Sequence, residues 1–146
     1  MNHVTVSLRH TESDADIARC FPVMHVLRPD LASAADFTAY VHRQAPLGYR
    51  LLAAWRDEAP VALAGYRRQE NLVHGPHLFV DDLVVLEGER RQNHGARLLD
   101  AIFNEAKQLG YRKVVLGAAL DNFLGHRFYF RQSMLATGFS FSRVVD

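Results

Sequence analysis

Alternation and clustering of apolar residues predict six strands along the chain. Residues 4–9 alternate between apolar and polar side chains, which is typical of a strand with one buried face. Short apolar runs bounded by glycine, proline or charged residues are typical of strands with both faces covered. The Asp57-Glu58 pair between two such runs predicts a turn and therefore an antiparallel hairpin. The predicted strands cover residues 4–9, 49–55, 61–67, 77–86, 113–116 and 135–145.

Four other segments repeat their apolar residues with the period of a helix. The first begins near the capping oxygens of Thr11, Ser13 or Asp14 and runs towards Met24, and we expect Pro22 to bend or end it. The other helices are predicted over residues 34–44, 93–109 and 122–134, with Gly110 as the residue after the third. The order of elements predicts an α/β protein, a mixed sheet with helices on its faces.

Two adjacent carboxylates, Asp81 and Asp82, interrupt the apolar pattern of the fourth predicted strand. A strand normally alternates between its two faces, so neighbouring charged residues indicate either a β-bulge or a functional site. A structural role is the alternative interpretation. One aspartate would then be exposed to solvent, and the other would pair with Arg50 or Arg67 on a neighbouring strand.

Composition narrows the class of protein. The chain has 146 residues, the size of one domain, and we expect a single domain over residues 1–146. Its 17 basic and 16 acidic residues leave a net charge of +1, which predicts no nucleic-acid or membrane partner. One cysteine, Cys20, excludes an internal disulfide and is expected to be buried. The absence of a signal-peptide pattern and of a long apolar run predicts a cytoplasmic protein.

The segment between the fourth strand and the third helix carries the most specific chemistry. The first N–H groups of a helix lack internal partners and bind anions such as phosphate. Gly95 has no side chain to keep a phosphate from the backbone, and Asn93 tolerates positive φ. Arg90 and Arg91 add positive charge. A solvated loop followed by a helix is the alternative, since short glycine motifs have many false positives.

Two motifs together resemble the GNAT family of N-acetyltransferases. Arg90-x-x-Asn93-x-Gly95-Ala96 is similar to the Arg/Gln-x-x-Gly-x-Gly/Ala motif with which that family binds acetyl-CoA. Asn122-x-x-Gly125-x-x-Phe128-Tyr129 is similar to the second motif, Asn-x-x-Ala-x-x-Phe-Tyr. The predicted element order matches the family fold, a central, mostly antiparallel sheet with helices on both faces. The chain departs from the pattern at Asn93, at Gly125 and at Ser133-Met134, where Gly-Phe often follows.

The resemblance implies that acetyl-CoA is the co-substrate and indicates the residues that bind it. The backbone of a strand would pair with the pantetheine arm, although the same residues are also candidates for the core. Asn122 would bind the arm or cap its own helix, and Phe128 would pack inward. The predicted CoA-binding residues are Leu83, Val84, Val85, Arg90, Arg91, Gln92, Asn93, His94, Gly95, Ala96, Asn122 and Phe128.

The same resemblance implies two catalytic residues. A phenol is a suitable proton donor to a departing thiolate, so Tyr129 is predicted as the general acid. Asp82 is predicted as the base that accepts the proton of the amine, directly or through water. Without the resemblance, Phe128-Tyr129 would be an ordinary aromatic pair covering a sheet.

We therefore expect an enzyme that transfers acetyl from acetyl-CoA to an amine on a small molecule or a peptide. A binding module of the same fold that senses acyl-CoA without catalysis is the alternative. A nucleic-acid-binding domain that uses Arg67, Arg68, Arg90 and Arg91 would be a third. The spacing of the eight histidines and the single cysteine predicts no metal site. Arg28, Asp30, Arg43 and Glu70 are candidates for selecting the acceptor, and a homodimer is possible for such a fold.

Overall fold

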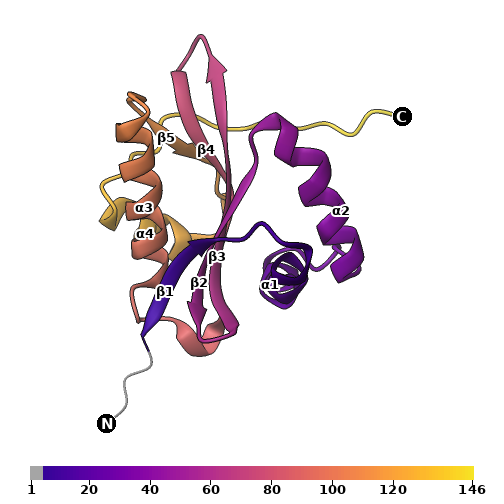
Figure 1. Cartoon of the computed structure of the whole chain (residues 1–146). Helices are drawn as coiled ribbons and strands as arrows, with labels where there is room; N and C mark the ends of the chain where they lie inside the picture. Colours follow the sequence, from indigo (N-terminus) through magenta and orange to yellow (C-terminus); the bar gives the residue numbers. More distant parts are fainter. Residues whose placement is uncertain (1–4) are drawn as a thin grey trace. The chain divides into compact units, whose positions relative to one another are not determined.

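The computed structural model describes residues 5–146 and forms two compact units, Met1–Val115 and Leu116–Asp146. A five-stranded sheet with the order β1-β2-β3-β4-β5 forms the centre of the first unit (Figure 1). The pairs β1–β2, β2–β3 and β3–β4 are antiparallel, as predicted. The first predicted strand is confirmed over Val6–His10, and Val4 lies outside the described residues. The strands are β1 (Val6–His10), β2 (Arg50–Arg56), β3 (Ala59–Asn71), β4 (Gly75–Val85) and β5 (Val114–Leu116).

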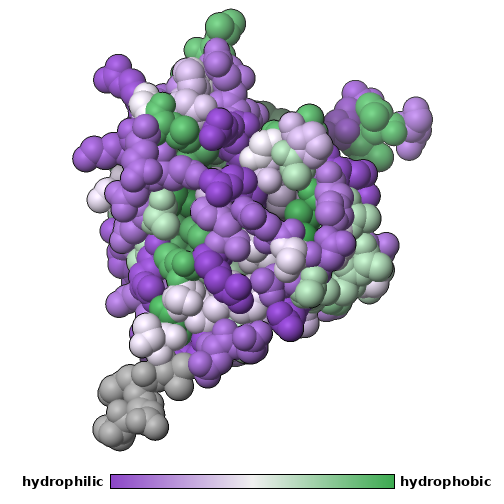
Figure 2. All heavy atoms as spheres, viewed as in Figure 1, coloured by the Kyte–Doolittle hydropathy of each residue, from purple (hydrophilic) through white to green (hydrophobic). Residues whose placement is uncertain are grey.

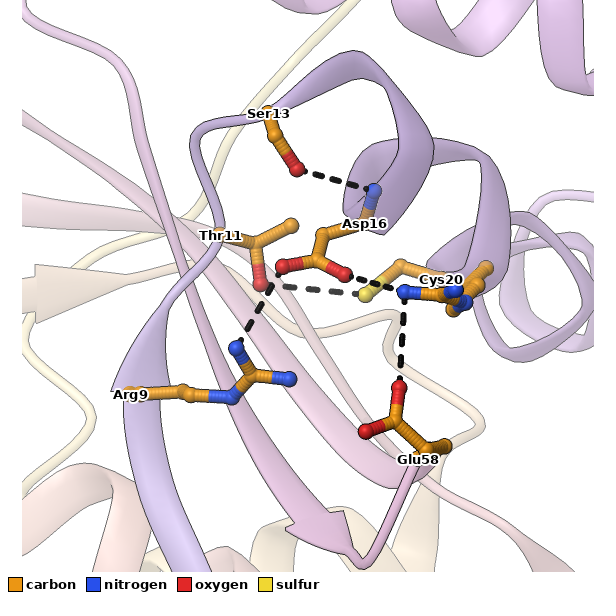
Figure 3. Close-up of polar contacts among 7 residues, drawn as sticks. Arg9, Thr11, Ser13, Asp16, Cys20 and Glu58 are labelled. Carbon is orange, nitrogen blue, oxygen red and sulfur yellow. Dashed lines mark hydrogen bonds and ion pairs between the residues drawn. The ribbon is translucent and has the colours of Figure 1, made fainter.

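The first helix, α1 (Asp14–Leu27), begins where a side chain caps it. Ser13 Oγ accepts a hydrogen bond from the Asp16 amide at 3.2 Å, and the Asp16 carboxylate in turn accepts hydrogen bonds from Arg9 and Arg19 (Figure 3). Pro22 does not end this helix, as one of the two predicted alternatives required, because the helix continues to Leu27. Apolar residues on both sides of the proline are buried, and this burial compensates for the lost backbone hydrogen bond.

Helices cover both faces of the sheet in the first unit. The helices α1 and α2 (Ala34–Gln44) lie on one side, and α3 (His94–Gln108) lies on the other (Figure 1). The bounds of α2 agree with the predicted residues 34–44, and Phe37 and Val41 of its apolar face are buried. The core beneath α1 and α2 includes Trp55, which is 1% exposed.

The predicted hairpin is present, and the structure adds a second one between β3 and β4. The β2–β3 turn falls at Asp57-Glu58 as predicted, with Asp57 in the left-handed region at φ 56°. The strands β3 and β4 extend further and leave only residues 72–74 as their turn. Leu72 and Val73 in this turn are exposed, and Figure 2 shows hydrophobic residues at the hairpin tip at the top of the view.

In the second unit, the helix α4 (Phe123–Arg131) ends three residues before the predicted end. The last predicted strand, residues 135–145, is wrong, because residues 134–146, all described, form neither helix nor strand. Alternation shows which face a strand would bury, but a strand exists only when a neighbour takes its hydrogen bonds. The tail keeps its apolar side chains in solvent, with Phe141 93% exposed.

Candidate active site

The predicted β-bulge is present at the two adjacent aspartates. In the β3–β4 ladder, Gly65 lies opposite Asp82 and Tyr66 lies opposite Val80, so Asp81 is the extra residue on β4. A bulge of this kind rotates the strand and re-aims its side chains. As a result, Asp81 and Asp82 contact different partners rather than alternating between two faces.

Asp82 is the more enclosed of the two carboxylates, with 10% of its side chain exposed. Arg28, which follows α1, donates from Nε to Asp82 Oδ1 at 2.8 Å. The Tyr49 hydroxyl donates to Asp82 Oδ2 at 3.4 Å. Arg28 also donates to the Asp81 carbonyl oxygen at 3.0 Å, so the guanidinium bridges the side chain and the backbone of the bulge. The half-exposed Arg28 was one of several candidates for selecting the acceptor, and its distance of 54 residues from Asp82 in sequence concealed the pairing.

Asp81 makes a separate network. Arg67 donates from Nε to Asp81 Oδ2 at 2.8 Å and from Nη1 to Gln44 Oε1 at 2.9 Å. Burial raises the pKa of Asp81 above its usual range, and the hydrogen bond from Arg67 opposes this shift. Asp81 thus forms the ion pair with Arg67 that was predicted as one possibility. Arg50, the other predicted partner, pairs with Glu105 instead.

Tyr49 is a site residue that sequence reasoning did not identify. It follows Gly48, which adopts φ 93° and turns the chain into β2. The Tyr49 ring is buried and packs against the Tyr40 ring in a T-shaped pair, with the centroids 5.5 Å apart. A Cβ atom at residue 65 would overlap the Tyr49 hydroxyl, so Gly65 makes room for it. Burial, followed by the charge of Asp82, raises the pKa of Tyr49 well above its usual range, so it remains a proton donor.

A cavity of about 230 Å³ opens beside Asp82 in the first unit. Its apolar and aromatic walls come from α1, α2 and the chain around them, and Asp82 and Arg28 are its charged side chains. Small-molecule sites typically combine apolar walls with a few polar groups in this way. The walls are Met24, Leu31, Phe37, Tyr40 and Tyr49.

The loop after β4 leads into an open helix N-terminus. A 3-10 turn, η2 (Glu87–Glu89), is followed by Arg91 at φ 70° and Asn93 at φ 64°. The tolerance of Asn93 for positive φ was predicted, whereas the left-handed conformation of Arg91 was not. Within the described residues no side chain caps α3, so its first N–H groups stay available to an anion. Gly95 is buried at this start.

An ion pair connects the loop after β4 to Arg56 at the end of β2. Arg56 donates from Nε and Nη2 to the Glu89 carboxylate at 3.1 and 2.8 Å, and from Nη2 to Gln92 Oε1 at 3.3 Å. The hydrogen bond from Arg56 lowers the pKa of Glu89. The buried His94 ring hydrogen-bonds Glu89 Oε2 at 3.2 Å through Nε2. The separation of 33 residues between Arg56 and Glu89 concealed this ion pair.

The predicted arm-binding strand occupies the end of β4. Leu83, Val84 and Val85 lie opposite Ala64, Leu63 and Ala62 of β3. Val84 is buried and its two neighbours are partly buried, so these residues pack. β4 has 11 residues and β5 has three, so among the described strands β5 covers only part of the other β4 edge. The side chains of Leu83, Val84 and Val85 can therefore pack in the core while their backbone remains available for hydrogen bonds.

The second unit contains the second predicted motif. Asn122 Oδ1 accepts a hydrogen bond from the Gly125 amide at 3.1 Å. Asn122 therefore caps α4, which is the second of the two roles predicted for it. A Cβ at residue 125 would overlap the Asn122 side chain, which explains why glycine suits this capped start. The Phe128 and Tyr129 rings pack at a centroid distance of 5.4 Å and an angle of 63°. Burial raises the pKa of Tyr129, which keeps the phenol protonated at neutral pH.

Several other sequence expectations concern single residues or absences. Cys20 is buried, as predicted, and burial raises its pKa to about 11. Residues 5–146 contain no group of three or more His, Cys, Asp or Glu side chains arranged to hold a metal ion. None of the helices in the described part of the chain has the length and apolar character needed to cross a membrane.

Known proteins resemble this chain in sequence and in fold. Residues 15–133 match the model of the acetyltransferase (GNAT) family. The N-acetyltransferase YhdJ of Bacillus subtilis (strain 168) is 29% identical over 128 residues, which cover 85% of this chain and 87% of that protein. The aminoglycoside N-acetyltransferase AAC(6')-Iy, in complex with CoA, superposes with a TM-score of 0.87 at 13% identity, covering 99% of this chain and 97% of the other. Ribosomal-protein-alanine N-acetyltransferase from Brucella melitensis biovar Abortus 2308 has a TM-score of 0.76 at 22% identity, covering 97% and 98%.

The chain belongs to the acetyltransferase (GNAT) family. It is an enzyme, an acetyl-CoA-dependent N-acetyltransferase, and its fold is the α/β fold of that family. The uncapped start of α3 and the neighbouring Arg90 and Arg91 fit the diphosphate of the co-substrate.

Proposed function

We propose that this enzyme acetylates a primary amine by direct attack on the thioester of acetyl-CoA. One continuous segment, residues 82–96, supports the proposal. It begins with a carboxylate in the wall of a cavity, continues through a strand edge and ends at an uncapped helix N-terminus. A base, a binding edge for an extended arm and an anion site therefore follow each other along the chain in the order that the reaction needs.

Binding of the co-substrate is assigned to the backbone as much as to side chains. The N–H groups of His94, Gly95 and Ala96 would receive the diphosphate, with Arg90, Arg91 and Gln92 at the exposed side of the loop. Asn93 holds the positive φ that turns these amides inward. Leu83, Val84 and Val85 would pair with the pantetheine arm through their backbone, and Phe128 and the amide group of Asn122 would complete its binding.

The proposed chemistry uses one base and one acid. Asp82 removes a proton from the ammonium form of the acceptor, directly or through water, and the neutral nitrogen attacks the thioester carbonyl carbon. The new C–N bond forms, and the C–S bond breaks with its electron pair remaining on sulfur. The amide nitrogen loses its second proton to solvent, and Tyr129 donates its phenolic proton to the departing thiolate. Its raised pKa keeps that proton available.

The acceptor is proposed to be an amine on a small molecule or a peptide. The similar proteins named above include one that acts on aminoglycosides and one that acts on a ribosomal protein alanine. We also propose that residues 1–146 work as a single N-acetyltransferase domain in the cytoplasm, without a metal, nucleic acid or membrane. A homodimer is proposed as well, and light scattering on the purified protein measures it directly.

Two measurements test the proposal. Calorimetry with CoA should show binding by the unmodified enzyme, and a thiol-release assay should show turnover with amines. Tyr129→Phe should slow release by roughly 100-fold or more, the usual contribution of an acid, while leaving the CoA affinity unchanged. Tyr111→Phe, which removes a hydroxyl elsewhere, is the matched control and should behave as the unmodified enzyme does.

Asp82→Asn tests the base in the same assay. It should lower kcat/KM for the amine, because an amide does not accept the proton. Asp100→Asn, at an exposed position of α3, should leave kcat/KM unchanged. Absence of CoA binding would overturn the proposed function as a whole. Unchanged release by Tyr129→Phe or unchanged turnover by Asp82→Asn would overturn the role assigned to that residue alone.

A further inference from the structure

The cavity beside Asp82 has a composition that selects among amines. Three of its wall residues, Met24, Leu31 and Phe37, offer no hydrogen-bonding side chain beyond a thioether. The Tyr49 hydroxyl is already directed to Asp82. Hydroxyl groups of a ligand that face Met24, Leu31 or Phe37 would have no hydrogen-bonding partner there, which costs binding energy for each group.

The size of the cavity sets a second limit. Its volume of about 230 Å³ exceeds the apolar cavity of about 150 Å³ that binds benzene in an engineered protein. One aromatic ring or branched aliphatic group with a short amine-bearing chain therefore fits inside. A molecule of several sugar rings exceeds this volume and would have to extend out of the cavity.

The charged groups at the cavity define where the nitrogen lies. Asp82 is 10% exposed, whereas its partner Arg28 is 53% exposed. A largely buried carboxylate needs a cationic partner, and an incoming ammonium can take the place of the exposed Arg28 side chain at Asp82. The polar end of an acceptor is thus directed to Asp82, and its body lies against the apolar walls.

We infer that the acceptor is a compact primary amine with an aromatic or branched apolar body, held in this cavity with its nitrogen at Asp82. The inference rests on the proposed function and specifies its substrate class. Leu31 and Tyr40 select the acceptor through their contacts with its body. They are positioning residues, since neither takes part in proton transfer.

A pair of probe amines tests the inference on the full-length enzyme. 2-Phenylethylamine carries an aromatic body, and glucosamine carries a ring of hydroxyl groups with one primary amine. After CoA binding has been established by calorimetry, thiol release should give a kcat/KM for 2-phenylethylamine at least 10-fold above that for glucosamine. Equal values, or a preference for glucosamine, would overturn the inference while leaving the acetyltransferase reaction intact. Failure to bind CoA would overturn the proposed function and this inference with it.

Two matched variants show whether the cavity makes the selection. Leu31→Ala removes part of the wall, and Leu47→Ala removes the same atoms from a side chain that is 64% exposed and does not line the cavity. Leu31→Ala should raise KM for 2-phenylethylamine roughly 10-fold with little change in kcat and none in CoA affinity. Leu47→Ala should change none of these. If Tyr40→Ala and Leu31→Ala both leave KM unchanged, the acceptor lies elsewhere and the inference is wrong.

Discussion

The Tyr49 hydroxyl fills the space that a side chain at Gly65 would need. Gly65 lies opposite Asp82 in the β3–β4 ladder, and the Tyr49 hydroxyl lies where a side chain at residue 65 would begin. That hydroxyl donates to Asp82 Oδ2. The absence of a single Cβ atom therefore allows the phenol to reach the carboxylate proposed as the catalytic base.

Gly65→Ala should consequently displace Tyr49 and disturb Asp82. Overpacking of a core usually costs about 1–3 kcal/mol, and we expect a loss of that size in the free energy of unfolding measured with denaturant. The kcat/KM for the amine should fall as well. Gly138→Ala is the control, because a Cβ at residue 138 meets no atom within 4 Å. Unchanged stability of Gly65→Ala would show that Tyr49 moves aside without cost.

The pH dependence of turnover tests the acid independently of the mutants above. Burial raises the pKa of Tyr129 above its ordinary value of 10.0. An acid works in its protonated form, so the loss of kcat caused by Tyr129 should have its midpoint above pH 10. This loss should be absent in Tyr129→Phe. A decline with a midpoint near pH 8 in the unmodified enzyme that Tyr129→Phe lacks would contradict the raised pKa.

Cys20 makes stability depend on pH in the alkaline range. The thiol has a pKa of about 11 in the folded protein against 9.0 as its ordinary value. Between these values the unfolded chain loses the proton and the folded protein keeps it, so stability is complete below pH 9 and falls as the pH rises to 11. The two-unit difference corresponds to roughly 2–3 kcal/mol.

Denaturant unfolding at several pH values measures this loss for the unmodified protein and for Cys20→Ala. The substitution also removes core volume, which lowers the free energy of unfolding at every pH. The test is therefore whether the gap in unfolding free energy between the two proteins changes from pH 8 to pH 11. Buried tyrosines lose stability in both proteins and cancel in this comparison. A difference that stays constant with pH would show that the thiol ionises equally in both states.

Ser133 adopts the left-handed conformation, at φ 63°, just after α4. The related family often places glycine here, and a left-handed residue with a Cβ atom costs about 1–2 kcal/mol. Ser133→Gly should therefore raise the free energy of unfolding by about 1 kcal/mol, after the added freedom of the unfolded chain is subtracted. Ser140→Gly, at a position without positive φ, should be neutral or slightly destabilising. A loss of stability in Ser133→Gly would mean that the serine side chain stabilises this turn.

Local chemistry explains what was predictable about this chain. The bounds of α2, the Asp57-Glu58 turn, the capping of α1 by Ser13 and the bulge at Asp81 each depend on a few neighbouring residues. The motif around residues 90–96 is also continuous in sequence, so the passage from the loop into the helix α3 follows from local residues. The positive φ of Asn93 follows from the same local preference.

Tertiary structure decided the features that depend on distant residues. The passage of α1 through Pro22 depends on burial of the apolar residues around it, and the missing strand over residues 135–145 depends on the lack of a partner. The surroundings of Asp82 are likewise distant in sequence, since Arg28 and Tyr49 come from other elements. Periodicity and capping act within one or two helical turns, whereas hydrogen-bond partners and cavity walls exist only once the chain has folded.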